Sequence, residues 1–147
     1  MLDGLQFVLR LDMIVKALID IYTVFIKYIC HQFGIIMNDI NPEIKSLIES
    51  QIQEHKVLLY MKGTPQFPQC GFSARAIEVL TQIGRPFAFV NILENPEIRA
   101  TLPLIANWPT FPQLWINGEL IGGSDIILQM YQAGELAPMV EAHSPEA

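Results

Sequence analysis

Cys70 is the residue of this sequence best placed for chemistry, because it lies between a proline-containing loop and the start of an expected helix. Pro65 and Pro68 mark the loop, and the helix is expected to begin at Gly71. Helix N-termini carry partial positive charge and unpaired N–H groups, which stabilise a thiolate and lower the pKa of the thiol. A structural core cysteine is the alternative. The prolines and the glycine favour a reactive or metal-ligating thiol.

Ser73 stands where a dithiol oxidoreductase of the C-x-x-C type carries its second cysteine. Serine cannot resolve a mixed disulfide, and the only other cysteine of the chain is Cys30. The domain can therefore form a mixed disulfide or ligate a metal, but it has no resolving thiol of its own. Two cysteines are too few for a secreted disulfide scaffold, and no cysteine–histidine set has zinc-site spacing. A lone thiol suits a reducing compartment, so we expect a cytoplasmic protein.

Three further features are candidates for ligand binding. Pro112 marks a strand start or a tight turn, and a cis bond after Phe111 would expose the Phe111 backbone to an extended ligand, although cis is the minority outcome. The segment 122–125, Gly-Gly-Ser-Asp, is either an ordinary helix cap or an N-terminus whose free N–H groups bind a carboxylate. Lys62 and Arg99 are either carboxylate-binding residues or solvated charges.

The elements that position these residues alternate between helix and strand. Asn41-Pro42-Glu43 and Asn95-Pro96-Glu97 have the residues of helix starts, and Asn117-Gly118 is a strong hairpin signal. The expected order is a helix over 42–55, a strand over 57–61, a helix over 71–83, a strand over 87–92, a helix from 95 that Pro103 should kink or shorten, strands over 113–116 and 119–121, a helix over 124–134 and a last helix over 135–141.

This order predicts an α/β fold. The first two strands are joined through a helix, so they should be parallel with a right-handed crossover. The last two strands should form an antiparallel hairpin. Burying both faces of such a sheet requires helices on each side, which gives a mixed four-stranded sheet flanked by helices.

The chain changes character at Met37, which divides it into residues 1–36 and a main domain over 37–147. Three basic and three acidic residues cancel within 1–36, so the net charge of −6 belongs to the main domain. An acidic domain without a basic stripe repels phosphate backbones. We therefore expect no nucleic-acid partner.

Residues 5–36 are very apolar, and three interpretations remain open. A transmembrane helix needs about 20 apolar residues, and charged residues interrupt this stretch. Asp12, Lys16 and Asp20 are four residues apart, which fits one polar face of an amphipathic helix. Translation starting at Met37 is the interpretation we favour, and we expect no membrane association. The stretch does not have the pattern expected of a signal peptide, because an acid precedes any basic residue and no small-residue cleavage motif is present.

Three motifs in combination resemble those of the monothiol, CGFS-type glutaredoxins, over about residues 42–141. The motifs are Lys62-Gly63-Thr64-Pro65-x-x-Pro68-x-Cys70-Gly71-Phe72-Ser73, then Trp108-Pro109-Thr110-Phe111-Pro112-Gln113-Leu114, then Gly122-Gly123-Ser124-Asp125. The resemblance implies a single-domain protein with a thioredoxin fold and with Pro112 in cis. It also favours a translation start near Met37.

The resemblance further implies a glutathione site and a metal cluster. Lys62 and Arg99 would bind the glycine carboxylate of glutathione, and the Phe111 backbone would pair with its cysteinyl unit. Thr110 and Pro112 belong to the same segment of the site. The γ-glutamyl end would lie on Gly123, Ser124 and Asp125. Two protomers and two glutathiones would share a [2Fe–2S] cluster, with Cys70 as the ligand from each protomer.

Two functions therefore compete for the main domain. The first is a cluster carrier that acts in iron–sulfur transfer or iron homeostasis, as a cluster-bridged homodimer or with a BolA-like protein, and that serves iron–sulfur recipient proteins. The second is a glutathione-dependent oxidoreductase that removes glutathione from proteins. The long loop over 63–69 favours the carrier, with at most weak oxidoreductase activity. A membrane-tethered module, anchored by residues 5–36, is a third hypothesis.

Overall fold

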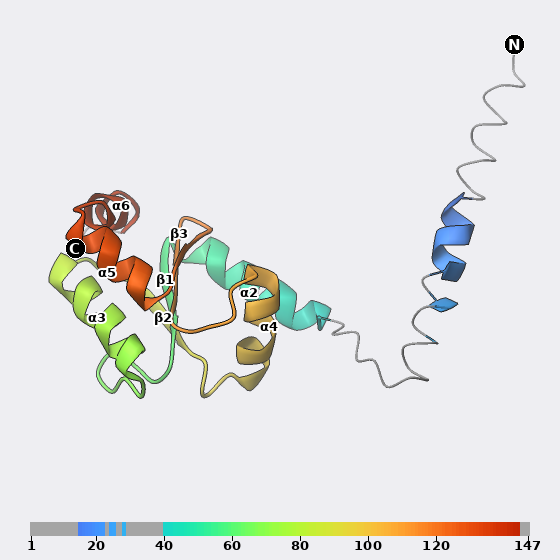
Figure 1. Cartoon of the computed structure of the whole chain (residues 1–147), viewed down its shortest axis with the longest axis horizontal. Helices are drawn as coiled ribbons and strands as arrows, with labels where there is room; N and C mark the ends of the chain where they lie inside the picture. Colours follow the sequence, from blue (N-terminus) through green and yellow to red (C-terminus); the bar gives the residue numbers. More distant parts are fainter. Residues whose placement is uncertain (1–14, 23, 26–27, 29–39, 145–147) are drawn as a thin grey trace, which may run out of the picture. The chain divides into compact units, whose positions relative to one another are not determined.

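The computed structural model describes residues 15–22, 24–25, 28 and 40–144. The chain divides into two units, 1–39 and 40–147 (Figure 1). In the first unit residues 15–22 are helical. Met37 and Cys30 lie outside the described residues, so the expected domain boundary stays a prediction. Within the described ranges, no helix has the length and apolar character needed to cross a membrane.

The second unit, as far as it is described, contains one mixed sheet with the strand order β2-β1-β3-β4. β1 pairs with β2 in parallel and with β3 in antiparallel orientation, and β3 pairs with β4 in antiparallel orientation. The expected mixed four-stranded sheet, its parallel pair and its terminal hairpin are therefore confirmed. The strands are β1 (Val57–Met61), β2 (Ala88–Asn91), β3 (Gln113–Ile116) and β4 (Glu119–Gly122).

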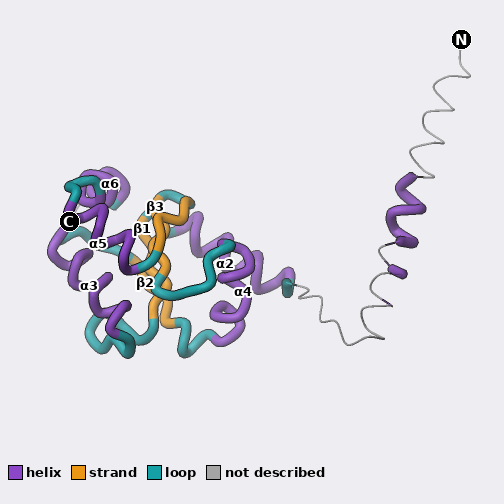
Figure 2. The backbone as a smooth tube through the Cα atoms, viewed as in Figure 1, coloured by secondary structure: helices purple, strands orange, loops and turns teal. Residues whose placement is uncertain are grey.

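β1 is a central strand, and all its side chains are buried because helices cover both faces of the sheet (Figure 2). Alternate residues of a strand point to opposite faces. Val57, Leu59 and Met61 accordingly pack in one apolar cluster, and Leu58 and Tyr60 pack in the other. The first cluster contains residues of α3 (Gly71–Ile83), α5 (Ser124–Gln132) and α6 (Leu136–His143), and the second contains residues of α2 (Pro42–Glu54) and α4 (Pro96–Ala106).

Most capping residues act as their types predict, whereas the Asn95 side chain makes no capping hydrogen bond at the start of α4. The Asn41 side chain accepts a hydrogen bond from the Glu43 amide at 2.9 Å, which caps α2. Gly84 ends α3 in the left-handed conformation, with φ of 74°. Asn117 and Gly118 both have positive φ, 51° and 87°, as a type I′ hairpin turn requires.

Pro103 was expected to kink or shorten the third main-domain helix; the shortening is wrong, and the kink stays a prediction. α4 continues through Pro103 to Ala106 and ends at Asn107, which has φ of 48°. Proline removes one hydrogen bond of the helix. Ile98 and Leu102 are buried in the cluster shared with α2, and this packing compensates for the missing bond.

Other boundaries differ by one or two residues from those expected. β2 is limited to the four residues that pair with β1, α5 ends at Gln132 and α6 extends to His143.

The segment between β1 and α3 is a compact hydrogen-bonded loop. Thr64 and Phe67 exchange backbone hydrogen bonds of 3.2 and 3.1 Å, and the Gln69 amide donates to the Lys62 carbonyl at 2.9 Å. Gly63 has φ of 90°, and a Cβ at this position would collide with the Phe67 carbonyl and lie 2.8 Å from the Gln69 nitrogen. Glycine at 63 therefore permits the tight path that leads into α3.

We predict that Gly63→Ala lowers the free energy of unfolding by more than Gly84→Ala does. Both glycines have positive φ, but nothing lies within 4 Å of a Cβ added at Gly84. The control variant should therefore lose only the backbone strain, about 1–2 kcal/mol. At Gly63 the collision adds at least about another 1 kcal/mol. Urea denaturation of both variants measures the difference, and equal losses would show that the loop tolerates a side chain.

Candidate functional site

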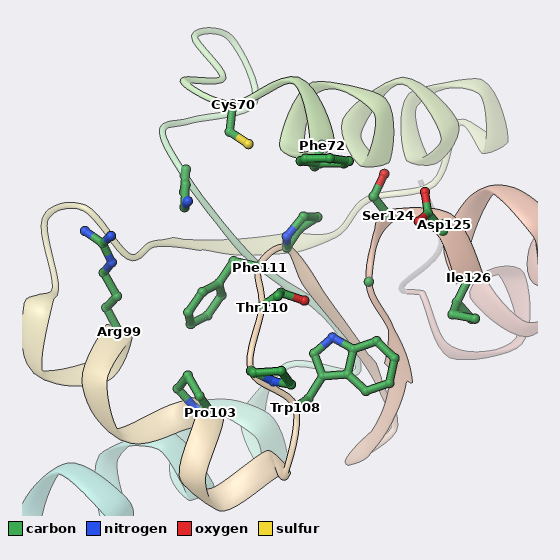
Figure 3. A pocket seen from close by; sticks show the side chains of 14 residues that line it. Cys70, Phe72, Arg99, Pro103, Trp108, Thr110, Phe111, Ser124, Asp125 and Ile126 are labelled. Carbon is green, nitrogen blue, oxygen red and sulfur yellow. The ribbon is translucent and has the colours of Figure 1, made fainter.

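A cavity of about 550 Å³ lies beside the N-terminus of α3 (Figure 3). Lys62 just after β1, the starts of α3 and α5, part of α4 and the segment before β3 contribute to its wall. The structure brings all the site residues predicted from the sequence to this cavity. They are Lys62, Cys70, Arg99, Thr110, Phe111, Pro112, Gly123, Ser124 and Asp125.

Cys70 is the N-cap residue of α3 and is partly exposed. Its backbone is extended, with φ of −151° and ψ of 136°, and its side chain makes no capping hydrogen bond. The Ser73 amide is the main cause that lowers the pKa of the Cys70 thiol. Partial burial acts in the opposite direction, and the Phe72 amide and the Lys62 charge lower this pKa further. The helix N-terminus thus favours the thiolate, as its position in the sequence predicts.

Charged and polar groups occupy opposite ends of the cavity. Figure 3 shows Arg99 at one end, Ser124 and Asp125 at the other, and Cys70 and Phe111 between them. The arrangement suits an extended ligand with an anionic group at each end, because a guanidinium binds a carboxylate and a helix N-terminus binds another. The thiol would lie along the middle of such a ligand.

The N-terminus of α5 has unpaired polar groups at the cavity wall. Gly123 is the N-cap residue, so no side chain caps the first amides of this helix. The Ser124 hydroxyl is buried and has no hydrogen-bond partner. The Asp125 carboxylate is mostly exposed and pairs at 3.6 Å with Arg75 of α3. These groups remain available to a ligand that carries both a carboxylate and an ammonium group.

The Phe111–Pro112 peptide bond is cis, in agreement with the resemblance. It lies in the segment that leads into β3, and both residues line the cavity.

The cavity wall also includes residues to which the sequence assigned no role. Trp108 is the largest of them, and a Cβ added at Gly123 would lie 3.5 Å from its indole nitrogen. The indole therefore supports the chain where α5 begins. The tryptophan–proline motif that contains Trp108 could have indicated a role in the site. No local sequence pattern, however, shows which helix this side chain packs against. The other such residues are Phe72, Pro103, Pro109 and Ile126.

The described residues supply a single thiol for metal binding. Cys70 is the one cysteine among them. They contain no group of three or more histidine, cysteine, aspartate or glutamate side chains arranged to hold a metal ion. Any metal centre built on Cys70 would therefore take its other ligands from elsewhere.

Comparison with known proteins identifies the family. The glutaredoxin family model matches residues 57–121, from the start of β1 into β4. Glutaredoxin 4 of Haemophilus ducreyi is 62% identical over 94 residues, which cover 64% of this chain and 88% of that protein. Glutaredoxin 4 of Escherichia coli K12 is 58% identical over 94 residues, which cover 64% and 82%.

Solved structures give the same result for the fold. Reduced apo GrxS14 of poplar is 46% identical and superimposes with a TM-score of 0.62 over 71% of this chain and 95% of that one. A buckwheat glutaredoxin in complex with glutathione is 20% identical and has a TM-score of 0.61 over 68% and 89%, which shows the fold alone. Sequence identity, coverage and the thioredoxin-type architecture agree, and the chain belongs to the glutaredoxin family, as a monothiol member with Cys70 in its CGFS motif.

Proposed function

We propose that this glutaredoxin binds glutathione in the cavity beside Cys70 and carries a [2Fe–2S] cluster, to which Cys70 contributes its thiolate. One observation carries the proposal. A thiol with a lowered pKa lies between a cationic end and an uncapped helix N-terminus of a single cavity. That arrangement complements the two ends of glutathione and presents a soft thiolate beside the peptide's own thiol.

Glutathione fits the chemistry of the wall from end to end. Lys62 and Arg99 bind its glycine carboxylate, and the Phe111 backbone pairs with its cysteinyl unit, with Thr110 and Pro112 shaping the same stretch. The γ-glutamyl carboxylate accepts hydrogen bonds at the start of α5, where Gly123 leaves room and Ser124 offers an unpaired hydroxyl. Asp125 neutralises the γ-glutamyl ammonium group. The solved complex of the buckwheat glutaredoxin contains glutathione.

The cluster is shared between protomers because one chain cannot ligate it. Iron–sulfur clusters of this type take four thiolates. Cys70 supplies one, a second copy of the chain supplies another, and two bound glutathiones supply the remaining two. A BolA-like protein is a proposed alternative partner, and iron–sulfur recipient proteins are the proposed acceptors of the cluster.

Reaction with glutathione mixed disulfides is the second candidate function, and the lowered pKa and partial exposure of Cys70 favour it. The Cys70 thiolate attacks the glutathione sulfur of a protein–glutathione disulfide, a Cys70–glutathione disulfide forms and the protein thiolate leaves. A second glutathione thiolate then attacks that disulfide and releases glutathione disulfide and Cys70. The reaction needs no second cysteine, which fits serine at position 73.

We predict that Cys70→Ser abolishes cluster binding and leaves the fold intact. The protein, purified without oxygen in the presence of glutathione, should show visible charge-transfer absorption and form a dimer, and the variant should be colourless and monomeric with an unchanged circular dichroism spectrum. Cys30→Ser is the matched control and should keep its colour. Normal iron content in Cys70→Ser would contradict the carrier assignment. A colourless wild-type monomer that rapidly reduces glutathione mixed disulfides would establish the oxidoreductase instead.

Lys62→Ala should weaken glutathione binding by about tenfold or more, because a charge-assisted hydrogen bond to the carboxylate is lost. Isothermal titration calorimetry measures the change. Lys45→Ala is the matched control, since Lys45 is an exposed lysine that pairs with Glu49 on α2 and does not line the cavity. Equal affinity in wild type and Lys62→Ala would show that Lys62 is only a surface charge.

Alkylation of Cys70 should have its pH midpoint below that of an ordinary thiol, about 8.5. The thiolate is the reacting form, so the rate rises as pH increases through the lowered pKa and is constant above it. The rate of reaction with iodoacetamide, followed across pH in the Cys30→Ser background, gives the midpoint. A midpoint at or above that of free cysteine would contradict stabilisation by the start of α3.

A further inference from the structure

Two buried polar side chains hold consecutive backbone amides just after β1. The Ser73 hydroxyl accepts a hydrogen bond from the Lys62 amide at 3.1 Å, and Asn91 Oδ1 accepts one from the Gly63 amide at 2.9 Å. Ser73 is fully buried, and Asn91 is 7% exposed. Buried amides need partners, and here α3 and β2 provide them after the strand has ended.

The Lys62 backbone is thereby hydrogen-bonded to one residue before and one residue after Cys70 in the sequence. Its amide is bonded to Ser73, three residues after the cysteine, and its carbonyl accepts from the Gln69 amide, one residue before it. The position of Lys62 relative to the thiol thus depends on these two short contacts. Its charge is one of the causes that lower the pKa of Cys70.

Asn91 is itself fixed by its neighbours, so it is a rigid acceptor. Its Oδ1 also accepts from the Leu93 amide at 3.1 Å, and its Nδ2 donates to Glu94 at 2.8 Å. Its carbonyl accepts from the Asn95 side chain at 2.8 Å. An acceptor held in this way fixes Gly63, at the start of the loop that leads to Cys70.

We propose that Ser73 and Asn91 are positioning residues, which hold Lys62 in register with Cys70 so that its ammonium group meets the glutathione carboxylate. The ligand in this statement rests on the proposed function, whereas the coupling of both residues to Lys62 does not. Ser73 then has a role of its own, besides lacking the thiol that would resolve a mixed disulfide. Its hydroxyl connects the helix that carries the thiol to the residue that carries the charge.

The test is a double-mutant cycle between Ser73→Ala and Lys62→Ala in the full chain. Ser73→Ala should weaken glutathione binding by about threefold to tenfold in the wild-type background, because Lys62 is no longer held. In the Lys62→Ala background the same change should have no further effect, since no ammonium group remains to be positioned. Equal losses in both backgrounds would overturn the proposal.

A second readout does not involve glutathione. Iodoacetate is anionic and iodoacetamide is neutral, so the ratio of their rates of reaction with Cys70 reports the positive charge near the thiol, whatever the thiolate fraction. In the Cys30→Ser background, Ser73→Ala should lower this ratio, because the Lys62 ammonium group moves away, and it should leave the ratio unchanged once Lys62→Ala is also present. An equal fall in both backgrounds, or no fall in either, would overturn the proposal. Absence of glutathione binding by the wild-type chain would instead refute the proposed function, and this rate cycle would still decide the positioning role.

Asn91 offers a conservative rescue. Asn91→Asp is combined with Glu94→Gln, because Asn91 Nδ2 donates to Glu94 and two carboxylates would otherwise face each other. This double variant keeps an oxygen that accepts from the Gly63 amide, so it should retain more glutathione affinity than Asn91→Ala. Tyr60→Phe is the control for a buried hydrogen bond away from the site, since it removes the 3.0 Å bond from Tyr60 to Gln51. It should lower stability without changing glutathione affinity. If Asn91→Ala does not fold, the Ser73 double-mutant cycle decides the proposal alone. If both Asn91 variants fold and bind glutathione with identical affinity, the positioning role of Asn91 is refuted.

Discussion

The amides at the start of α3 are the interaction on which the site depends. The side chain of the N-cap residue Cys70 makes no capping hydrogen bond, and the Ser73 and Phe72 amides at this helix start lower the pKa of its thiol. Their effect requires a helix that cannot tilt or fray, and Ala76 and Leu80 provide this by packing on β1 in one of the two apolar clusters. The lowered pKa of the partly exposed Cys70 thiol thus depends on buried side chains about two helical turns further along α3, because their packing holds the helix start in place.

The same packing directs a second helix N-terminus at the same cavity. α3 and α5 lie side by side over one face of the sheet, and residues at the start of each line the cavity. Lys62 and Arg99 add full charges to these partial ones. A chain with a net charge of −6 therefore has a cavity with one locally cationic end. Binding of the proposed ligand depends on this local geometry, whereas the net charge of the chain repels polyanions.

Much of this arrangement could be predicted from short-range patterns, because those patterns act within a few residues. Asn41 as a cap, Asn117-Gly118 as a turn and Cys70 before a helix each have a local physical cause. The path of α4 through Pro103 depends instead on packing against α2, which no local pattern encodes. The partner of Ser73 lies eleven residues away, across the loop, and that of Asn91 lies 28 residues away. Only the folded chain reveals such contacts.

The contact between Ser73 and Lys62 also bears on why a serine stands where related chemistry uses a cysteine. A thiol is a weaker hydrogen-bond acceptor than a hydroxyl, and its sulfur is larger, so it would hold the Lys62 amide less firmly in a fully buried space. A cysteine at this position would supply a resolving thiol. It would also loosen the residue whose charge lies near Cys70. A cysteine at position 73 would allow a mixed disulfide to be resolved, and a serine holds Lys62 more firmly. One side chain cannot do both, and the serine of this chain favours the fixed position of Lys62.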